Sequence, residues 1–209
     1  MIVNKNIYKY INNLIYNKEP KYLKFIREKV YKNINKKNMS DNLQGRFLSL
    51  ISKIKNPKFI LEIGTFIGYS SLCLSEGLKK GGLLITIDNN KKYINYANNN
   101  IKNTIYKKNI KIIYGKALNI INKLKIKFDI VFIDADKKNY IKYFKLVINK
   151  INKNGIIIVD NVLWKGLVIN KKKDIFTNYI HKFNKSLKKY NISNIIIPIR
   201  DGINLIIKN

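Results

Sequence analysis

The sequence predicts an α/β protein in which a mostly parallel sheet carries helices on both faces and closes with an antiparallel hairpin. Short apolar runs alternate with helical patterns after residue 58, the order that builds a parallel sheet covered on both sides. Near the C-terminus, two apolar runs are joined through Arg200, Asp201 and Gly202, and an Asp-Gly pair between such runs is a strong hairpin signal. With 209 residues and 46% hydrophobic content, the chain is long enough for one domain with a full core. We therefore expect residues 1–209 to form a single domain.

The first 55 residues are expected to form helices, which precede an α/β core formed by residues 56–209. Apolar residues recur at helical spacing around Ile7 and Ile11, and again around Phe25 and Ile26 after Pro20. A third helix is expected to begin near Asp41, a residue type that caps helix N-termini. These amphipathic helices must pack on the sheet or on a second subunit, and the pattern leaves both open.

The first expected strand, residues 59–63, ends at a turn that contains Gly64 and Gly68. Glycines let a ligand approach the backbone, and Ser70 with Ser71 opens a helix whose free N–H groups face it. The carboxylate of Glu62 would repel a pyrophosphate, so a cationic or neutral ligand is better suited to the turn. Taken alone, the turn also fits an ordinary strand-to-helix connection.

The strand ends carry the other candidate site residues. In an open α/β sheet, ligands bind outside the carboxyl ends of the strands. Asp88 ends the second strand near the place of a carboxylate that binds ribose hydroxyls. The remaining strands are expected at 110–114, 128–133, 155–159, 194–198 and 203–207, and polar or glycine-bearing turns follow the first five strands at Gly64, Asp88, Gly115, Asp134 and the pair Asp160 and Asn161.

Asp134, Asp160 and Asn161 offer only oxygen ligands, which suits a hard cation such as Mg²⁺ or Ca²⁺ better than zinc. The alternative is that these residues simply cap the following helices. An acid repeated at the ends of the fourth and fifth strands, with an amide beside it, favours the metal site.

The formal net charge of +30 invites a nucleic-acid interpretation. Only Arg27, Arg46 and Arg200 among the 42 basic residues are arginine, however, and arginine is the favoured side chain for reading phosphates and bases. Lys, Asn, Ile and Tyr have AT-rich codons, so a biased genome explains the composition more simply, and we expect only non-specific adhesion to nucleic acid.

The sequence has neither an apolar run of about 20 residues nor a signal-peptide core, which predicts a cytoplasmic protein without a membrane span. The single Cys73 excludes an internal disulfide and is expected to be buried.

Together, the motifs resemble the metal- and S-adenosylmethionine-dependent O-methyltransferases of the catechol and caffeoyl-coenzyme A type, from about Met39 to the C-terminus. The resemblance implies a Rossmann-like, seven-stranded methyltransferase sheet with an antiparallel last strand, and usually a homodimer. The motifs that carry it are Leu-Glu-Ile-Gly-Thr at 61–65 with Gly-Tyr-Ser at 68–70, Asp-Ala-Asp-Lys at 134–137 with Asn-Tyr at 139–140, Asp-Asn-Val-Leu-Trp at 160–164 with Gly166, and Pro-Ile at 198–199 with Asp-Gly at 201–202.

The same resemblance assigns roles to individual residues. Lys137 matches the general base, Trp164 would border the acceptor, and Leu167 and Arg200 depart from the family pattern in a way that leaves the acceptor preference open. The cofactor-binding residues would be Met39, Glu62, Gly64, Ser70, Asp88, Ala117 and Asp134, and the metal ligands Asp134, Asp160 and Asn161.

We therefore expect methyl transfer from S-adenosylmethionine to a hydroxyl of a catechol-like small molecule, assisted by a divalent cation: Mg²⁺ first, with Ca²⁺ or Mn²⁺ as alternatives. One competing hypothesis is an RNA methyltransferase, for which the charge is the only support. Many such enzymes carry an Asn/Asp-Pro-Pro-aromatic motif where this chain has Asp134, Ala135, Asp136 and Lys137. The other is a non-catalytic basic nucleic-acid-binding protein, which gives no reason for acids to recur at strand ends.

Overall fold

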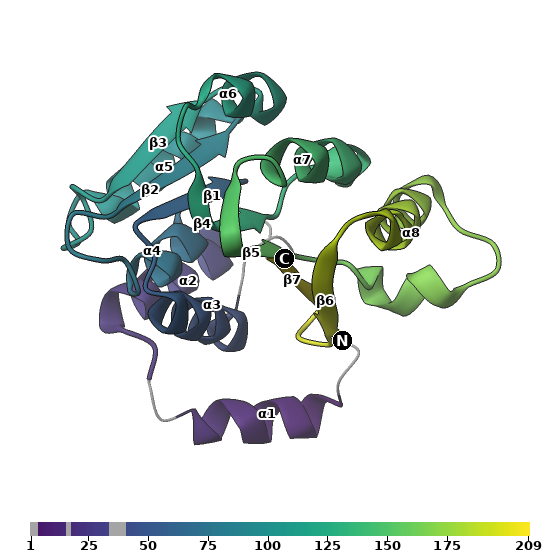
Figure 1. Ribbon diagram of the computed structural model, residues 1–209. Coiled ribbons are helices and arrows are strands. Elements are labelled where there is room, and N and C mark those ends of the chain that lie inside the picture. Colours follow the sequence, from purple (N-terminus) through teal and green to yellow (C-terminus); the bar gives the residue numbers. More distant parts are fainter. Residues whose placement is uncertain (1–3, 16–17, 34–40) are drawn as a thin grey trace.

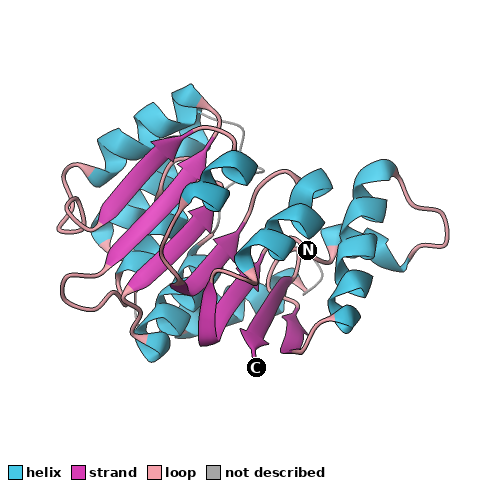
Figure 2. Ribbon diagram, turned by 45° about the horizontal axis from the view of Figure 1, so that its top comes forward, coloured by secondary structure: helices cyan, strands magenta, loops and turns pink. Residues whose placement is uncertain are grey.

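The computed structural model describes residues 4–15, 18–33 and 41–209. Seven strands form one sheet in the order β3-β2-β1-β4-β5-β7-β6, with helices on both of its faces (Figures 1 and 2). Strands β1 to β5 run parallel, and β7 lies antiparallel between β5 and β6. This confirms the predicted fold class, including the antiparallel hairpin. The strands are β1 (Phe59–Ile63), β2 (Leu83–Asp88), β3 (Ile110–Tyr114), β4 (Phe128–Ile133), β5 (Ile151–Val159), β6 (Ile192–Ile197) and β7 (Ile203–Lys208).

The predicted start of the fifth strand was wrong, because β5 begins at Ile151 instead of residue 155. Its pairing with β4 is irregular: Phe128 pairs with Ile151, but Ile130 already pairs with Ile156. Asn154 has a left-handed backbone at the irregularity (φ 58°). The residues between Ile151 and Ile156 are polar or glycine, so the apolar pattern does not predict the start of the strand.

Each face of the sheet has its own core, since alternate residues of a strand point to opposite faces. Leu61 and Ile63 of β1 join one cluster, whereas Ile60 joins the other. The first cluster lies under α6 (Ala117–Lys123), α7 (Tyr140–Val147) and α8 (Ile175–Ser186). The second lies under α2 (Lys21–Asn33), α3 (Asn42–Lys55), α4 (Tyr69–Ser75) and α5 (Lys91–Ile101), and it contains the buried Cys73. Three short 3₁₀ segments also occur in the described ranges: η2 (Lys137–Asn139), η3 (Trp164–Ile169), which is interrupted by a kink at Lys165 and Gly166, and η4 (Leu187–Lys189).

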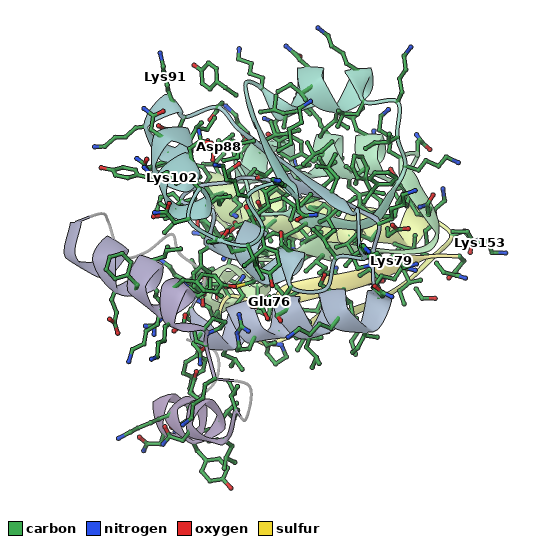
Figure 3. The ribbon with its side chains drawn as sticks, turned by 90° about the vertical axis from the view of Figure 1, so that its left-hand side faces the viewer. Glu76, Lys79, Asp88, Lys91, Lys102 and Lys153 are labelled. Atoms are coloured by element: carbon green, nitrogen blue, oxygen red, sulfur yellow. The ribbon has the colours of Figure 1, made fainter. Side chains whose placement is uncertain are left out.

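A buried ion pair fastens α3 to the end of α4. Glu76, labelled in Figure 3, accepts hydrogen bonds from the Arg46 guanidinium at 2.7 and 3.0 Å and from Ser49 Oγ at 2.7 Å. Arg46 and Glu76 are both buried, whereas Lys53, whose Nζ lies 3.0 Å from Glu76, is 41% exposed. Helices α2 and α3 pack on the sheet, because Leu23 and Ile26 of α2 and Leu48 of α3 belong to the core cluster on this face.

Helix α1 (Lys5–Leu14) stands apart from the sheet and its covering helices (Figures 1 and 3). Its Tyr8 hydroxyl donates a hydrogen bond to Asp41, the residue that caps α3. Ile7, Tyr10 and Leu14 of this helix are exposed. None of the helices in the described ranges has the length and apolar character needed to cross a membrane.

Candidate functional site

A large pocket lies at the carboxyl ends of β1 to β5. The strand order reverses at β1, whose neighbours are β2 and β4, and such a switch point is where open α/β sheets bind ligands. The pocket has a volume of about 1380 Å³, more than the about 300–1,000 Å³ typical of a site for one small molecule. It therefore has room for two ligands. The predicted site residues that line it are Gly64, Ser70, Asp88, Ala117, Asp134, Lys137, Asp160 and Asn161.

Gly64 allows the ends of β1 and β4 to approach each other. Its φ is 103°, and a Cβ at this position would lie 1.9 Å from the carbonyl oxygen of Asp134. The Asp134 N–H donates to the carbonyl of Ile63 at 2.9 Å, and the Gly64 N–H donates to the carbonyl of Ile87 at the same distance. Only glycine fits here, and the absence of its side chain brings Asp134 beside the first turn.

Asp88, labelled in Figure 3, ends β2 and lines the pocket. One carboxylate oxygen accepts the backbone N–H of Phe66 at 2.9 Å, and the other accepts that of Asn90 at 2.8 Å. These bonds fix the carboxylate and leave lone pairs on both oxygens for a ligand's hydroxyls. Phe66 and Tyr93, two aromatic side chains that also line the pocket, meet edge to face with ring centroids 4.6 Å apart.

Glu62 is fully buried in β1 and does not line the pocket. Its carboxylate accepts hydrogen bonds from Ser70 Oγ at 2.5 Å and from the Ser71 hydroxyl. Burial raises the pKa of Glu62 to about 7, against the lowering effect of these hydroxyls. Glu62 thus holds the first turn of α4, and Ser70 is the member of this group that reaches the pocket.

Asp134, Lys137 and Asn161 meet at one point of the pocket. Lys137 Nζ donates to Asp134 Oδ1 at 3.0 Å and to Asn161 Oδ1 at 2.7 Å. It also lies 2.5 Å from the Tyr140 hydroxyl, which donates in turn to the backbone carbonyl of Asp160 at 3.1 Å. The ammonium group shows that these oxygens can surround a positive charge.

The charges of this cluster act on one another. Burial lowers the pKa of Lys137, but Tyr140, Asp134 and Asp160 outweigh it, so the pKa is raised and the ammonium form is favoured. Burial and the charge of Asp134 raise the pKa of Asp160 to about 7. Gln44 opposes that shift by donating from Nε2 to Asp160 Oδ2 at 2.6 Å.

The donor chemistry of the predicted metal site fits a hard cation, because it consists of two carboxylates and an amide oxygen. No group of three or more His, Cys, Asp or Glu side chains that could hold a metal ion occurs within residues 4–15, 18–33 and 41–209. The predicted set has only two acids, Asp134 and Asp160, so the metal stays a prediction.

Comparisons with known proteins decide the family. The model of the O-methyltransferase family matches residues 13–209. The chain belongs to this family. It is 30% identical over 214 residues to caffeoyl-CoA O-methyltransferase 2 of Petunia hybrida, covering 95% of this chain and 88% of that relative. An O-methyltransferase from Bacillus cereus, solved in complex with SAH, superposes with a TM-score of 0.87 at 27% identity and 96% coverage of both chains. SAH-bound PaMTH1 of Podospora anserina gives a TM-score of 0.89 at 26% identity, over 98% of this chain and 95% of that one.

The predicted resemblance and the predicted enzyme class, an S-adenosylmethionine-dependent O-methyltransferase, are thereby confirmed. The roles of individual residues stay predictions. Met39 lies outside the described residues. Trp164 lines the pocket with its ring centroid 6.0 Å from Lys137 Nζ, and its place beside the acceptor stays a prediction.

In this O-methyltransferase, three residues at the site have no role predicted from the sequence: Gln44, Tyr140 and Phe66. Tyr140 belongs to the Asn-Tyr motif at 139–140, but nothing in the motif shows that its hydroxyl reaches Lys137. Gln44 gave a weak signal: it is a polar residue one helical turn before the buried Leu48, on the apolar side of α3. Phe66 gave none, because its place at the pocket depends on a left-handed backbone (φ 48°).

Proposed function

We propose that this O-methyltransferase transfers a methyl group from S-adenosylmethionine to a hydroxyl of a catechol-like small molecule, with a divalent cation, Mg²⁺ first, held by Asp134, Asp160 and Asn161. One observation carries the proposal. The side-chain oxygens of Asp134 and Asn161 converge on a single cationic group, Lys137 Nζ, inside a pocket large enough for two ligands. Ca²⁺ and Mn²⁺ share this oxygen chemistry and are the alternatives.

The methyl donor would occupy the half of the pocket formed by the ends of β1, β2 and β3. Asp88 offers fixed carboxylate oxygens to ribose hydroxyls. Gly64 and Ser70 lie beside the path of a methionine chain, with Glu62 behind Ser70, and Ala117 offers a small surface to a flat ring. The relatives from Bacillus cereus and Podospora anserina, both solved with SAH, support this choice of ligand.

The acceptor would lie near Lys137 and Trp164, where Asp134 and Asp160 also reach the pocket. Acids at this position repel the negatively charged phosphodiester backbone of RNA, which favours a small acceptor over RNA. When bound, a divalent ion supplies positive charge that lowers the pKa of an acceptor hydroxyl and offsets the carboxylates that keep Lys137 protonated.

In the proposed mechanism Lys137, as the neutral amine, accepts the proton of the acceptor hydroxyl at Nζ. The acceptor oxygen then forms a bond to the methyl carbon while the carbon–sulfur bond breaks and its electron pair stays on sulfur, which leaves SAH. Tyr140 holds Nζ at 2.5 Å, so the base is fixed before the acceptor arrives. Much of the acceleration comes from holding the two reactants in line in one pocket.

A calorimetric titration of S-adenosylmethionine, with and without Mg²⁺, tests the proposal together with a methyl-transfer assay on catechols. We expect saturable binding that Asp88→Ala abolishes, and an Asp160→Ala variant that binds the donor but no longer responds to Mg²⁺. Asp174→Ser is the matched control, because Asp174 caps α8 away from the pocket and serine also caps helices. Absence of donor binding by the wild type, or a full Mg²⁺ response in Asp160→Ala, would refute the proposal.

We also propose that the enzyme is a homodimer. Helix α1 presents the exposed side chains of Ile7, Tyr10 and Leu14, and the edge strand β6 presents Ile195, which is 60% exposed. Exposed apolar side chains of this kind favour association. Sedimentation at several concentrations would reveal a monomer if this is wrong. The cytoplasmic location and the single domain over residues 1–209 stay predictions from the sequence.

A further inference from the structure

We propose that Gln44 and Arg200 are positioning residues that fix the orientation of the Asp160 carboxylate. The inference rests on the proposed function, because it takes Asp160 to be a ligand of the divalent ion. Neither residue was expected to hold a ligand of the site: Gln44 belongs to α3 and Arg200 to the loop between β6 and β7.

Gln44 connects Arg200 to Asp160. Its side chain is fully buried, with Nε2 donating to Asp160 Oδ2 at 2.6 Å and Oε1 accepting from Arg200 Nη1 at 2.9 Å. The other carboxylate oxygen, Asp160 Oδ1, accepts the backbone N–H of Asn161 at 2.7 Å. Both oxygens of Asp160 are therefore held by one donor each, and each keeps a lone pair for a cation.

The direction of the Gln44 amide is set by its partners. A guanidinium can only donate, so the amide oxygen must face Arg200. The amide NH₂ must then face Asp160, which as a carboxylate can only accept. Without Arg200, the amide could turn its oxygen towards the carboxylate and repel it. Arg200 thus fixes the orientation of Asp160 through Gln44.

The backbone of Arg200 supports a selected role for its side chain. Its φ is 52°, in the left-handed region that residues with a Cβ seldom adopt. Strain of this kind collects at functional sites. Seven described non-glycine residues have positive φ, and five of them line the pocket: Phe66, Asn161, Trp164, Lys165 and Arg200.

Asp41 contacts Arg200 through the guanidinium Nε, a different nitrogen from the one that donates to Gln44 Oε1. Its carboxylate caps α3 by accepting the Gln44 N–H at 3.0 Å, and Asp41 Oδ2 lies 3.6 Å from Arg200 Nε. The guanidinium therefore lies between the cap of α3 and the Gln44 side chain. Helix α3 and the C-terminal hairpin, far apart in the sequence, are tied together at the end of β5.

The test measures Mn²⁺ binding by the loss of its free electron-paramagnetic-resonance signal, with S-adenosylmethionine affinity measured in parallel by calorimetry. Replacing a group that orients a metal ligand typically weakens metal binding by about 10–100-fold. We expect Gln44→Met, which has the same shape but no donor, to weaken Mn²⁺ binding by about tenfold or more while donor affinity changes less than twofold. Arg200→Met should weaken it in the same direction, and Arg200→Lys, which keeps a donor, should restore most of the loss.

The double variant separates a relay from two independent effects. If Arg200 acts through Gln44, then Gln44→Met with Arg200→Met binds Mn²⁺ no more weakly than Gln44→Met alone. Ser49→Ala is the matched control, because it removes a buried polar contact of the same helix that faces Glu76 and not the pocket. If Gln44→Met does not fold, the comparison of Arg200→Met with Arg200→Lys decides the question, and equal affinities overturn the proposal.

Two kinds of failure can be told apart. A wild type that binds the methyl donor but not Mn²⁺ refutes the divalent-ion part of the proposed function, and this inference with it. A wild type that binds Mn²⁺, with Gln44→Met binding it equally well or with additive losses in the double variant, overturns the positioning pair alone.

Discussion

Gly64→Ala is the sharpest test of how the strand ends are assembled. The new methyl group would lie 1.9 Å from the carbonyl oxygen of Asp134 and 2.8 Å from its carbonyl carbon, and φ at this residue is 103°. The backbone strain alone costs about 1–3 kcal/mol. Separating β1 from β4 to remove the overlap costs about 1–3 kcal/mol more, as for other overpacked sites. We therefore expect the free energy of unfolding to fall by about 2–6 kcal/mol.

Gly81→Ala provides the control for that measurement. Gly81 also has a positive φ, 73°, but nothing lies within 4 Å of a Cβ built there. In this variant only the backbone strain should lower the free energy of unfolding, by about 1 kcal/mol. Urea denaturation of both variants and the wild type gives the comparison. If the two variants lose equal stability, the close approach of β1 and Asp134 does not constrain the fold as we argue. S-adenosylmethionine affinity should fall in Gly64→Ala and stay at the wild-type value in Gly81→Ala.

Two further predictions concern buried acids outside the proposed metal ligands. Burial raises the pKa of Glu62 from 4.5 to about 7, so the folded state binds a proton more tightly than the unfolded state, and stability falls as the pH rises through this interval. The Glu62→Gln variant lacks this titration, so its free energy of unfolding, measured by urea denaturation, should rise relative to that of the wild type between about pH 4.5 and pH 7. A stability difference between the two proteins that does not change with pH would count against the burial effect. Glu76→Gln leaves the buried Arg46 guanidinium without a counter-charge and should cost about 3 kcal/mol, whereas Lys53→Ala removes a half-exposed partner of the same acid and should cost under about 1 kcal/mol. Similar losses in these two variants would contradict the distinction between buried and exposed partners.

The local pattern of the sequence was enough to predict most strands and the place of the site. Strands β1 to β4 lie where short apolar runs end at glycine or at an acid. For β1, β2 and β4 the reason is burial, because a strand buried on both faces must be apolar and a polar residue at its end stays near water. For the same reason the sequence pattern alone places Asp88, Asp134 and Asp160 at one edge of the sheet. It does not place the start of β5, because the first paired residue of that strand is followed by Asn152, Lys153 and Asn154, which carry no apolar pattern.

The tertiary structure alone decided which side chains meet. Asp160 could be chosen from its place after a strand, but Gln44 and Arg200 reach it from a helix and a hairpin that are distant in sequence, and no local periodicity records such contacts. The position of β7 between β5 and β6 likewise depends on hydrogen bonds between strands, which a single strand does not encode. The sequence by itself thus determined where the polar strand ends lie, because burial acts on each segment separately. The orientation of Asp160 depends on the packing of α3 against the hairpin, and only the folded chain determines it.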